Sequence, residues 1–253
     1  MNSFKAYLKK EIIEGIRSYK YLIIGVSIVL FAILDPLMLK MLPKILENQV
    51  SMNIVASIEM TQKMAVQNYM KDLFQIVNIV LALSLMGILA DEVKGQTLAF
   101  PYSKGVSKTG MVLAKTINYS LVIPIFMFIG FSINYYYSKI LFSKDVIDYL
   151  QVMKGALLFS SYYIFNISLI VLLSSLVKKG LIAGFLTLAI IFTMPLFYKI
   201  NSISEFLPYN LVTHANMLDQ SGGIPWISFG VTFVYIVVFN ILTIYRMKRV
   251  EAL

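Results

Sequence analysis

The chain has 253 residues, of which 58% are apolar and only 14% are charged, and its mean hydropathy is +0.77. Soluble domains usually carry about 25% charged residues, so this composition excludes a water-soluble surface. The formal net charge is +9, but the basic residues stand in short segments between apolar runs, which indicates membrane topology and not nucleic-acid binding. The chain contains no cysteine, which excludes disulfides, thiol catalysis and sulfur-based zinc sites.

The apolar residues form runs that are long enough to cross a membrane. A helix rises about 1.5 Å per residue, so roughly 20 apolar residues span the hydrocarbon layer. The sequence therefore predicts an all-α integral membrane protein with six transmembrane helices in a single domain over residues 1–253. We place the spans at residues 21–42, 72–90, 117–138, 152–177, 181–199 and 224–245. We expect no cleavable signal peptide, because the first run exceeds a typical signal core and lacks a small-residue cleavage site.

The distribution of lysine and arginine predicts the orientation of the spans. An even number of spans places both termini on the same side. Of the 22 basic residues, fourteen lie on that side, in the terminal segments and in the connections 91–116 and 178–180. By the positive-inside rule, both termini are expected in the cytoplasm.

The first twenty residues have helical periodicity. One face carries apolar residues and the other carries basic ones: Phe4, Leu8, Ile12, Ile16 and Tyr19 against Lys5, Lys9, Lys10 and Arg17. This pattern predicts an amphipathic helix at the inner membrane surface. A charged anchor that only follows the positive-inside rule explains the same residues equally well. In the first span, Asp35-Pro36 predicts a kink or an early exit from the membrane.

The connections differ in length and character. Residues 43–71 are expected outside the membrane, as a helix, a bent extension of the second span or a mobile loop. Residues 91–116 form the longest cytoplasmic connection. The connection at residues 178–180 is so short that the fourth and fifth spans should form a tight hairpin. Residues 200–223 suit a short re-entrant or interfacial element, followed by Trp226 at headgroup level.

The sequence offers little chemistry for catalysis or metal binding. His214 is the only histidine and has no partner at ligand spacing, so it is interpreted as an ordinary loop residue. Asp91 and Glu92 are adjacent and would point about 100° apart on a helix, which is unsuited to paired acid-base work. The segment 105–110 lacks the glycine spacing of a phosphate-binding loop. We expect no catalytic residue, no metal site and no cofactor in this chain.

The spans carry neutral polar side chains that could line a translocation pathway. Such groups either line a pathway or form hydrogen bonds between helices, and helix packing is the commoner role. The pathway candidates are Asn78, Asn118, Ser161, Asn166 and Asn240. No charged relay is expected in the middle of a span, so energy for transport would have to come from another protein.

Residues 91–116, DEVKGQTLAFPYSKGVSKTGMVLAKT, hold an ordered set of motif residues. With the six spans and the N-terminal amphipathic helix, this segment resembles the loop after the second span in permeases of the type-2 ABC exporter family. Two positions depart from the family pattern, because Gln96 separates the glycine from the threonine and lysine replaces the commoner arginine at position 104. The matching residues are Glu92, Gly95, Thr97, Leu98, Pro101, Ser103, Lys104 and Lys115.

The resemblance implies partners and a site. Two permease subunits, identical or homologous, would pair around a pathway in the lipid bilayer, and each would dock a separate P-loop ATPase that binds ATP and Mg. The ATPase-coupling interface would contain Lys9, Glu11, Glu92, Gly95, Thr97, Leu98, Tyr102, Ser103 and Lys104. Family members export peptides, drugs, lipids and polysaccharides. The small size and separate ATPase resemble bacterial members that expel antimicrobial or toxin peptides, which implies a multi-pass protein of a bacterial plasma membrane.

Two other functions fit parts of the sequence. A non-transporting immunity or sensor module would bind a peptide at the outer surface through residues 43–71 and 200–223. An intramembrane enzyme is disfavoured because the side chains that it would need are absent.

Overall fold

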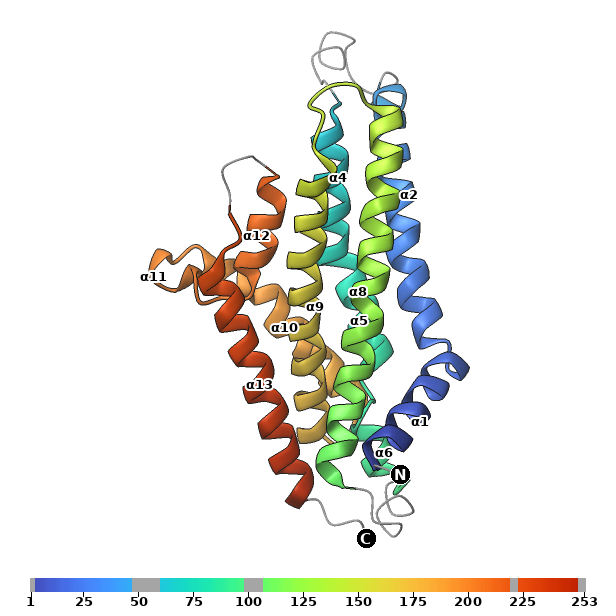
Figure 1. Cartoon of the computed structure of the whole chain (residues 1–253), viewed down its shortest axis with the longest axis vertical. Coiled ribbons are helices and arrows are strands. Elements are labelled where there is room, and N and C mark those ends of the chain that lie inside the picture. The colour runs from blue at the N-terminus through green and yellow to red at the C-terminus, as the bar shows by residue number, and fades with distance from the viewer. Residues whose placement is uncertain (1–2, 47–59, 98–106, 219–222, 250–253) are drawn as a thin grey trace.

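The computed structural model describes residues 3–46, 60–97, 107–218 and 223–249, and within these ranges the chain is helical and contains no β-strand. This confirms the all-α fold. Six helices are long and apolar enough to cross a membrane: Lys20–Pro43, Gln62–Lys94, Lys108–Leu141, Tyr149–Leu176, Gly180–Tyr198 and Trp226–Arg249. The first helix, α1 (Ser3–Arg17), and the C-terminal end of the last helix, α13 (Trp226–Arg249), lie at the same end of the bundle (Figure 1). We refer to it as the α1 end.

Helix α1 (Ser3–Arg17) packs against α8 and α2, and the face that it buries differs from the apolar face predicted from the sequence. Tyr7 and Glu11 are buried at 5% and 2% exposure, whereas Ile12 and Ile16 are exposed at 41% and 61%. The predicted amphipathic helix is therefore present, but only its N-terminal half uses apolar residues to contact the bundle. Tyr19, with a φ of 58°, separates α1 from the next helix.

Helix α2 (Lys20–Leu46) continues through Pro36 and Pro43, so the chain stays helical at Asp35-Pro36. The kink or early exit from the membrane expected there stays a prediction. Asp35 is buried at 8% exposure, and α4 (Gln62–Asp72) and α8 (Lys108–Leu141) both pack against α2. Neighbouring helices can shield the backbone that a proline leaves unpaired, which allows a span to continue.

The second span is divided into three helical segments. It comprises α4 (Gln62–Asp72), the π-helical η1 (Leu73–Val77) and α5 (Asn78–Leu85). Helix α4 thus extends the span into the region predicted as residues 43–71; of that region, residues 47–59 lie outside the described part of the chain. A turn at residues 86–89 leads to the short helix α6 (Ala90–Lys94).

The remaining helices surround α9. Helix α9 (Tyr149–Leu176) packs against α8 (Lys108–Leu141), α10 (Gly180–Tyr198), α12 (Tyr209–Met217) and α13 (Trp226–Arg249). Figure 1 shows α9 between α8 and α13, with α12 beside its upper half. Helices α9 and α10 form the short hairpin that the sequence predicts. Within residues 200–223, the structure describes α11 (Asn201–Ser204) and α12.

Candidate functional site

An ion-pair network joins α1, α6 and α8 at the α1 end of the bundle. Lys115 Nζ of α8 lies 2.8 Å from Glu11 Oε1 of α1 and 3.0 Å from Glu92 Oε2 of α6. Lys10 Nζ lies 2.8 Å from Glu92 Oε1, 3.0 Å from Glu11 Oε1 and 2.7 Å from Glu14 Oε2. We call these five residues the Lys115 network. It connects three elements that are far apart in the sequence.

The centre of the network is shielded from solvent. The side chains of Lys115 and Glu11 are 1% and 2% exposed, and the Tyr7 ring centroid lies 5.7 Å from Lys115 Nζ and 5.0 Å from Lys10 Nζ. A buried charge loses its hydration, so it must be compensated by a partner of opposite charge. The paired carboxylates and the ring of Tyr7 provide that compensation.

The same pairing shifts the pKa values of residues on α1. Burial alone would lower the pKa of Lys10, but the nearby carboxylates of Glu92, Glu14 and Glu11 raise it above its ordinary value. Burial would raise the pKa of Glu14, but the hydrogen bond and charge of Lys10 lower it below its ordinary value. Both residues are therefore held in their charged forms around neutral pH.

Three carboxylates of the network approach one another closely. Ligand atoms of Glu11, Glu14 and Glu92 lie within 4.8 Å of one another. Lys10 and Lys115 contact these same carboxylates and supply the positive charge that a metal ion would otherwise provide. The arrangement is therefore suited to tying helices together.

A serine holds the turn that precedes α6. Ser174 Oγ of α9 accepts hydrogen bonds from the backbone N–H groups of Leu89, at 3.1 Å, and Ala90, at 3.0 Å, and donates to the Met86 carbonyl at 2.9 Å. The turn also touches the start of α10, because a Cβ on Gly180 would lie 2.7 Å from Gly87 Cα. The segment that carries Glu92 is thus fixed to both helices of the α9–α10 hairpin.

Three members of the Lys115 network, Lys10, Glu14 and Glu92, line a pocket of about 520 Å³ at the α1 end. The pocket lies between α1, the start of α2, the end of the second span and α6. It is lined by Lys10, Glu14, Lys20, Leu83, Ser84, Met86, Gly87, Ile88, Asp91, Glu92 and Thr97. Charged residues of both signs therefore meet apolar residues of the second span in one cavity.

The structure brings together only part of the predicted coupling interface. Glu11 and Glu92 meet at Lys115. Lys9 and Gly95 are exposed, and the Thr97 hydroxyl donates to the Glu92 carbonyl at 3.3 Å. The other four predicted residues, Leu98, Tyr102, Ser103 and Lys104, lie outside the described residues.

The interface prediction did not include the basic members of the network. The sequence places Lys10 on the polar face of α1 and matches Lys115 to the family motif, but the predicted interface contains neither. The available signal was a lysine placed next to the long apolar run of the third span, where a buried charge requires an acidic partner. Nothing in the sequence pattern indicated that Glu11, 104 residues away, is that partner.

All five predicted pathway residues form hydrogen bonds within the chain. Asn166 Nδ2 donates to Asn78 Oδ1 at 2.9 Å, and Asn78 Nδ2 donates to the Phe74 carbonyl of η1 at 2.8 Å. Asn118 accepts from the Tyr21 hydroxyl, Asn240 donates to Ser168 Oγ, and Ser161 donates to the Leu157 carbonyl. The bonds of Asn78, Asn118, Asn166 and Asn240 join different helices and fit the helix-packing alternative, whereas the Ser161 bond lies within α9. A role in a pathway stays a prediction.

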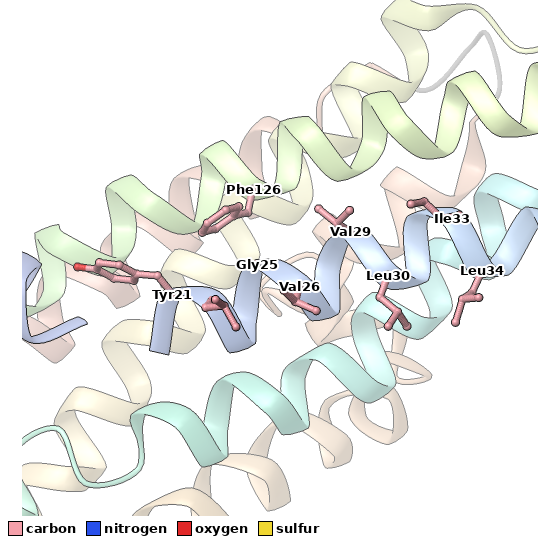
Figure 2. A pocket seen from close by; sticks show the side chains of 9 residues that line it. Tyr21, Gly25, Val26, Val29, Leu30, Ile33, Leu34 and Phe126 are labelled. Carbon is pink, nitrogen blue, oxygen red and sulfur yellow. The ribbon is translucent and has the colours of Figure 1, made fainter. Parts of the chain in front are cut away.

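An apolar groove of about 630 Å³ runs along α2 beside α8. Figure 2 shows Val26, Leu30 and Leu34 along α2, with Phe126 beside Gly25. A Cβ on Gly25 would lie 2.8 Å from the Phe126 ring, so the glycine makes room for this contact. The groove is lined by Tyr21, Leu22, Gly25, Val26, Val29, Leu30, Ile33, Leu34 and Phe126. Its walls suit hydrocarbon and offer little to a polar cargo.

Comparison with known proteins matches nearly the whole chain to one family. The model of the family described as ABC-2 family transporter protein matches residues 6–252. This range includes all six spans and every member of the Lys115 network. No curated protein matches the chain.

Proposed function

The chain belongs to the ABC-2 transporter family, and from this premise we propose that it is the permease subunit of an ATP-driven exporter that works with a separate ATPase. Membership of the family makes it a multi-pass membrane component of an ABC transporter. The sequence has no phosphate-binding loop at residues 105–110, where the glycine spacing of such a loop is missing. ATP and Mg would therefore be bound by a partner chain.

The observation that supports this proposal most directly is the Lys115 network. It connects α1 and α6, which lie at one end of the bundle, to the long transmembrane helix α8. Ser174 and the Gly87–Gly180 contact connect the same end to α9 and α10. A displacement of α1 or α6 by an ATPase would therefore be transmitted to three spans.

The network also suggests that some coupling residues hold the helices together and that others contact the ATPase. Glu11 and Glu92 are already paired within the chain, so their role is to hold α1 and α6 on α8. Exposed neighbours such as Lys9, Lys94 and Gly95 would make the contact with the ATPase. The excess of lysine and arginine at the α1 end supports a cytoplasmic location for this surface.

The wider assembly follows from the family resemblance. Two permease subunits would pair in a bacterial plasma membrane, with the exposed apolar faces of the spans covered by the partner subunit or by lipid. The substrate class that fits best is an amphipathic peptide of the antimicrobial or toxin type, exported from the cytoplasm.

The coupling role is tested by affinity purification of the tagged chain from its native membranes. We expect a P-loop ATPase to co-purify and ATP hydrolysis to require both chains. Replacing exposed Lys94 with Glu should weaken retention of the ATPase about tenfold or more, since a reversed contact charge costs on the order of 1.4 kcal/mol or more. The matched control is Lys139→Glu, which changes an exposed lysine near the opposite end of α8. Transport by the purified chain alone in ATP-free liposomes would refute the proposal.

A further inference from the structure

The pocket beside the Lys115 network contains two charged residues that the network does not use. Lys20 begins α2, and Asp91 is the second residue of α6. Both line the pocket, and neither forms an ion pair among the described residues. The other charged lining residues are paired, because Lys10 binds both Glu14 and Glu92. Lys20 is near enough to Glu14 for its charge to help lower the pKa of that carboxyl, but it forms no ion pair with it. The pocket therefore offers one cation and one anion that are not engaged in an ion pair.

The position of the Asp91 carboxylate depends on two glycines. A Cβ on Gly87 would overlap with the Asp91 carboxylate, and a Cβ on Gly180 would lie 3.2 Å from Asp91 Oδ1. The absence of side chains at both positions gives the carboxylate its space. The Asp91 side chain has no hydrogen-bond partner within the described ranges, so its oxygens remain available to a ligand.

The pocket also extends across a membrane boundary. Leu83 and Ser84 belong to the apolar second span, and Leu83 is 46% exposed on its surface. Lys10 on α1 and Thr97 after α6 lie beyond the apolar part of that span. A molecule with a charged head and an apolar tail could therefore place its head among the charges and its tail along Leu83. Phospholipids have this form.

We propose that this pocket binds the headgroup of a phospholipid that carries a primary ammonium group, as phosphatidylethanolamine does. Lys20 would bind the phosphate, and Asp91 would accept hydrogen bonds from the ammonium. These two charges match this zwitterion, whereas a purely anionic headgroup would leave Asp91 without a partner and close to a like charge. The proposal does not depend on transport or on an ATPase.

Thermal unfolding of the purified full chain in nanodiscs provides the test. The lipids are phosphatidylethanolamine and phosphatidylcholine with identical acyl chains, because the methylated ammonium of choline cannot donate a hydrogen bond. We expect the Tm to be higher in phosphatidylethanolamine by about 3 °C or more, the size of shift that roughly one additional contact produces in a chain of this length. Native mass spectrometry should show phosphatidylethanolamine retained in preference to phosphatidylcholine.

The variants separate the two ends of the headgroup. Asp91→Asn, which preserves the shape of the side chain, should abolish the difference between the two lipids. Lys20→Gln should weaken retention of both lipids, since both carry a phosphate. Gly87→Ala should displace Asp91 and behave as Asp91→Asn does. Lys139→Gln, near the opposite end of α8, should keep the wild-type preference.

Three outcomes would overturn the proposal. The wild-type chain could have equal Tm values and equal retention in both lipids. Asp91→Asn could lower the Tm equally in both lipids, which would show that Asp91 only stabilises the packing of α6 against the start of α10. Phosphatidylglycerol could stabilise the chain more than phosphatidylethanolamine, with dependence on Lys20 alone, which would indicate a general site for anionic lipid. Since no ATPase is present, each of these outcomes leaves the proposed function unaffected.

Discussion

Lys115 is the residue on which the arrangement of the α1 end depends most. Its side chain is 1% exposed and lies between Glu11 and Glu92. Burying an ammonium group costs several kcal/mol, which only well-placed carboxylates can offset. The loss of one partner leaves the other charges buried without compensation, so the network is more sensitive to removal of a single member than its net stability would suggest.

We therefore expect Lys115→Met to lower the free energy of unfolding by about 3–5 kcal/mol, because Glu11 would remain buried without its cation. Thermal unfolding of the purified chain measures this change. Lys139→Met removes an exposed lysine from the same helix and should have little effect. The double variant Glu11→Leu with Lys115→Met should recover part of the loss. Equal unfolding temperatures for Lys115→Met and Lys139→Met would contradict the role given to Lys115.

The lowered pKa of Glu14 predicts a weakening of α1 in acid. A carboxylate whose pKa is lowered on folding stabilises the fold above its ordinary pKa of about 4.3, and this contribution is lost as the pH falls through the lower folded pKa. We expect the Tm of the chain to fall between about pH 5 and pH 3. The Glu14→Gln variant should start lower at neutral pH and show a smaller fall. The Glu14 side chain is 40% exposed, so we expect a small effect. Identical profiles of Tm against pH for the wild-type chain and Glu14→Gln would contradict this role of Glu14.

At the scale of elements, the turn before α6 depends on one side chain from α9. Ser174→Ala removes two bonds to backbone N–H groups and one to a backbone carbonyl. Buried backbone groups left unpaired cost about 1–3 kcal/mol each, partly recovered by water. We expect faster hydrogen exchange at residues 89–94 and a lower Tm. Ser161→Ala is the matched control, since Ser161 Oγ bonds only to the Leu157 carbonyl of its own helix. Unchanged exchange in Ser174→Ala would show that the turn is held by other contacts.

Several elements follow from the sequence because a membrane leaves the backbone few choices. Apolar runs must form helices there, so the six spans were predictable. The packing face of α1 was not, because Tyr7 and Glu11 lie outside its apolar pattern. The π-helical segment at Leu73–Val77 also has no counterpart in the apolar pattern. Its carbonyl at Leu73 is satisfied by the Tyr163 hydroxyl, 90 residues away.

The candidate site also contains contacts that the sequence pattern does not predict. Family motifs located Glu92 and the segment that carries it, since these residues are close together in the sequence. Ion-pair partners follow from how helices pack, and this packing depends on contacts across the whole chain. The pairing of Lys115 with Glu11 and the position of Asp91 between two glycines therefore became visible only in three dimensions.

At the scale of the whole molecule, orientation decides whether the α1 end can meet an ATPase. The chain has no cysteine, so single cysteines introduced at exposed positions report topology without background. Lys94 ends α6, Lys178 lies in the connection between α9 and α10, and Ser143 lies in the connection between α8 and α9. Figure 1 shows α6 at the α1 end and the α8–α9 connection at the opposite end, and Gly180, next to the α9–α10 connection, approaches Gly87 at the α1 end. The excess of lysine and arginine near the α1 end favours the cytoplasm for that end.

We expect a membrane-impermeant maleimide to label Ser143→Cys in intact cells. Lys94→Cys and Lys178→Cys should be labelled only after the membrane is permeabilised, because cytosolic positions are inaccessible to the reagent. Equal expression of the three variants, measured by labelling in detergent, is the control. The reverse pattern would place the Lys115 network outside the cell, away from ATP, and would rule out the α1 end as the surface on which an ATPase acts.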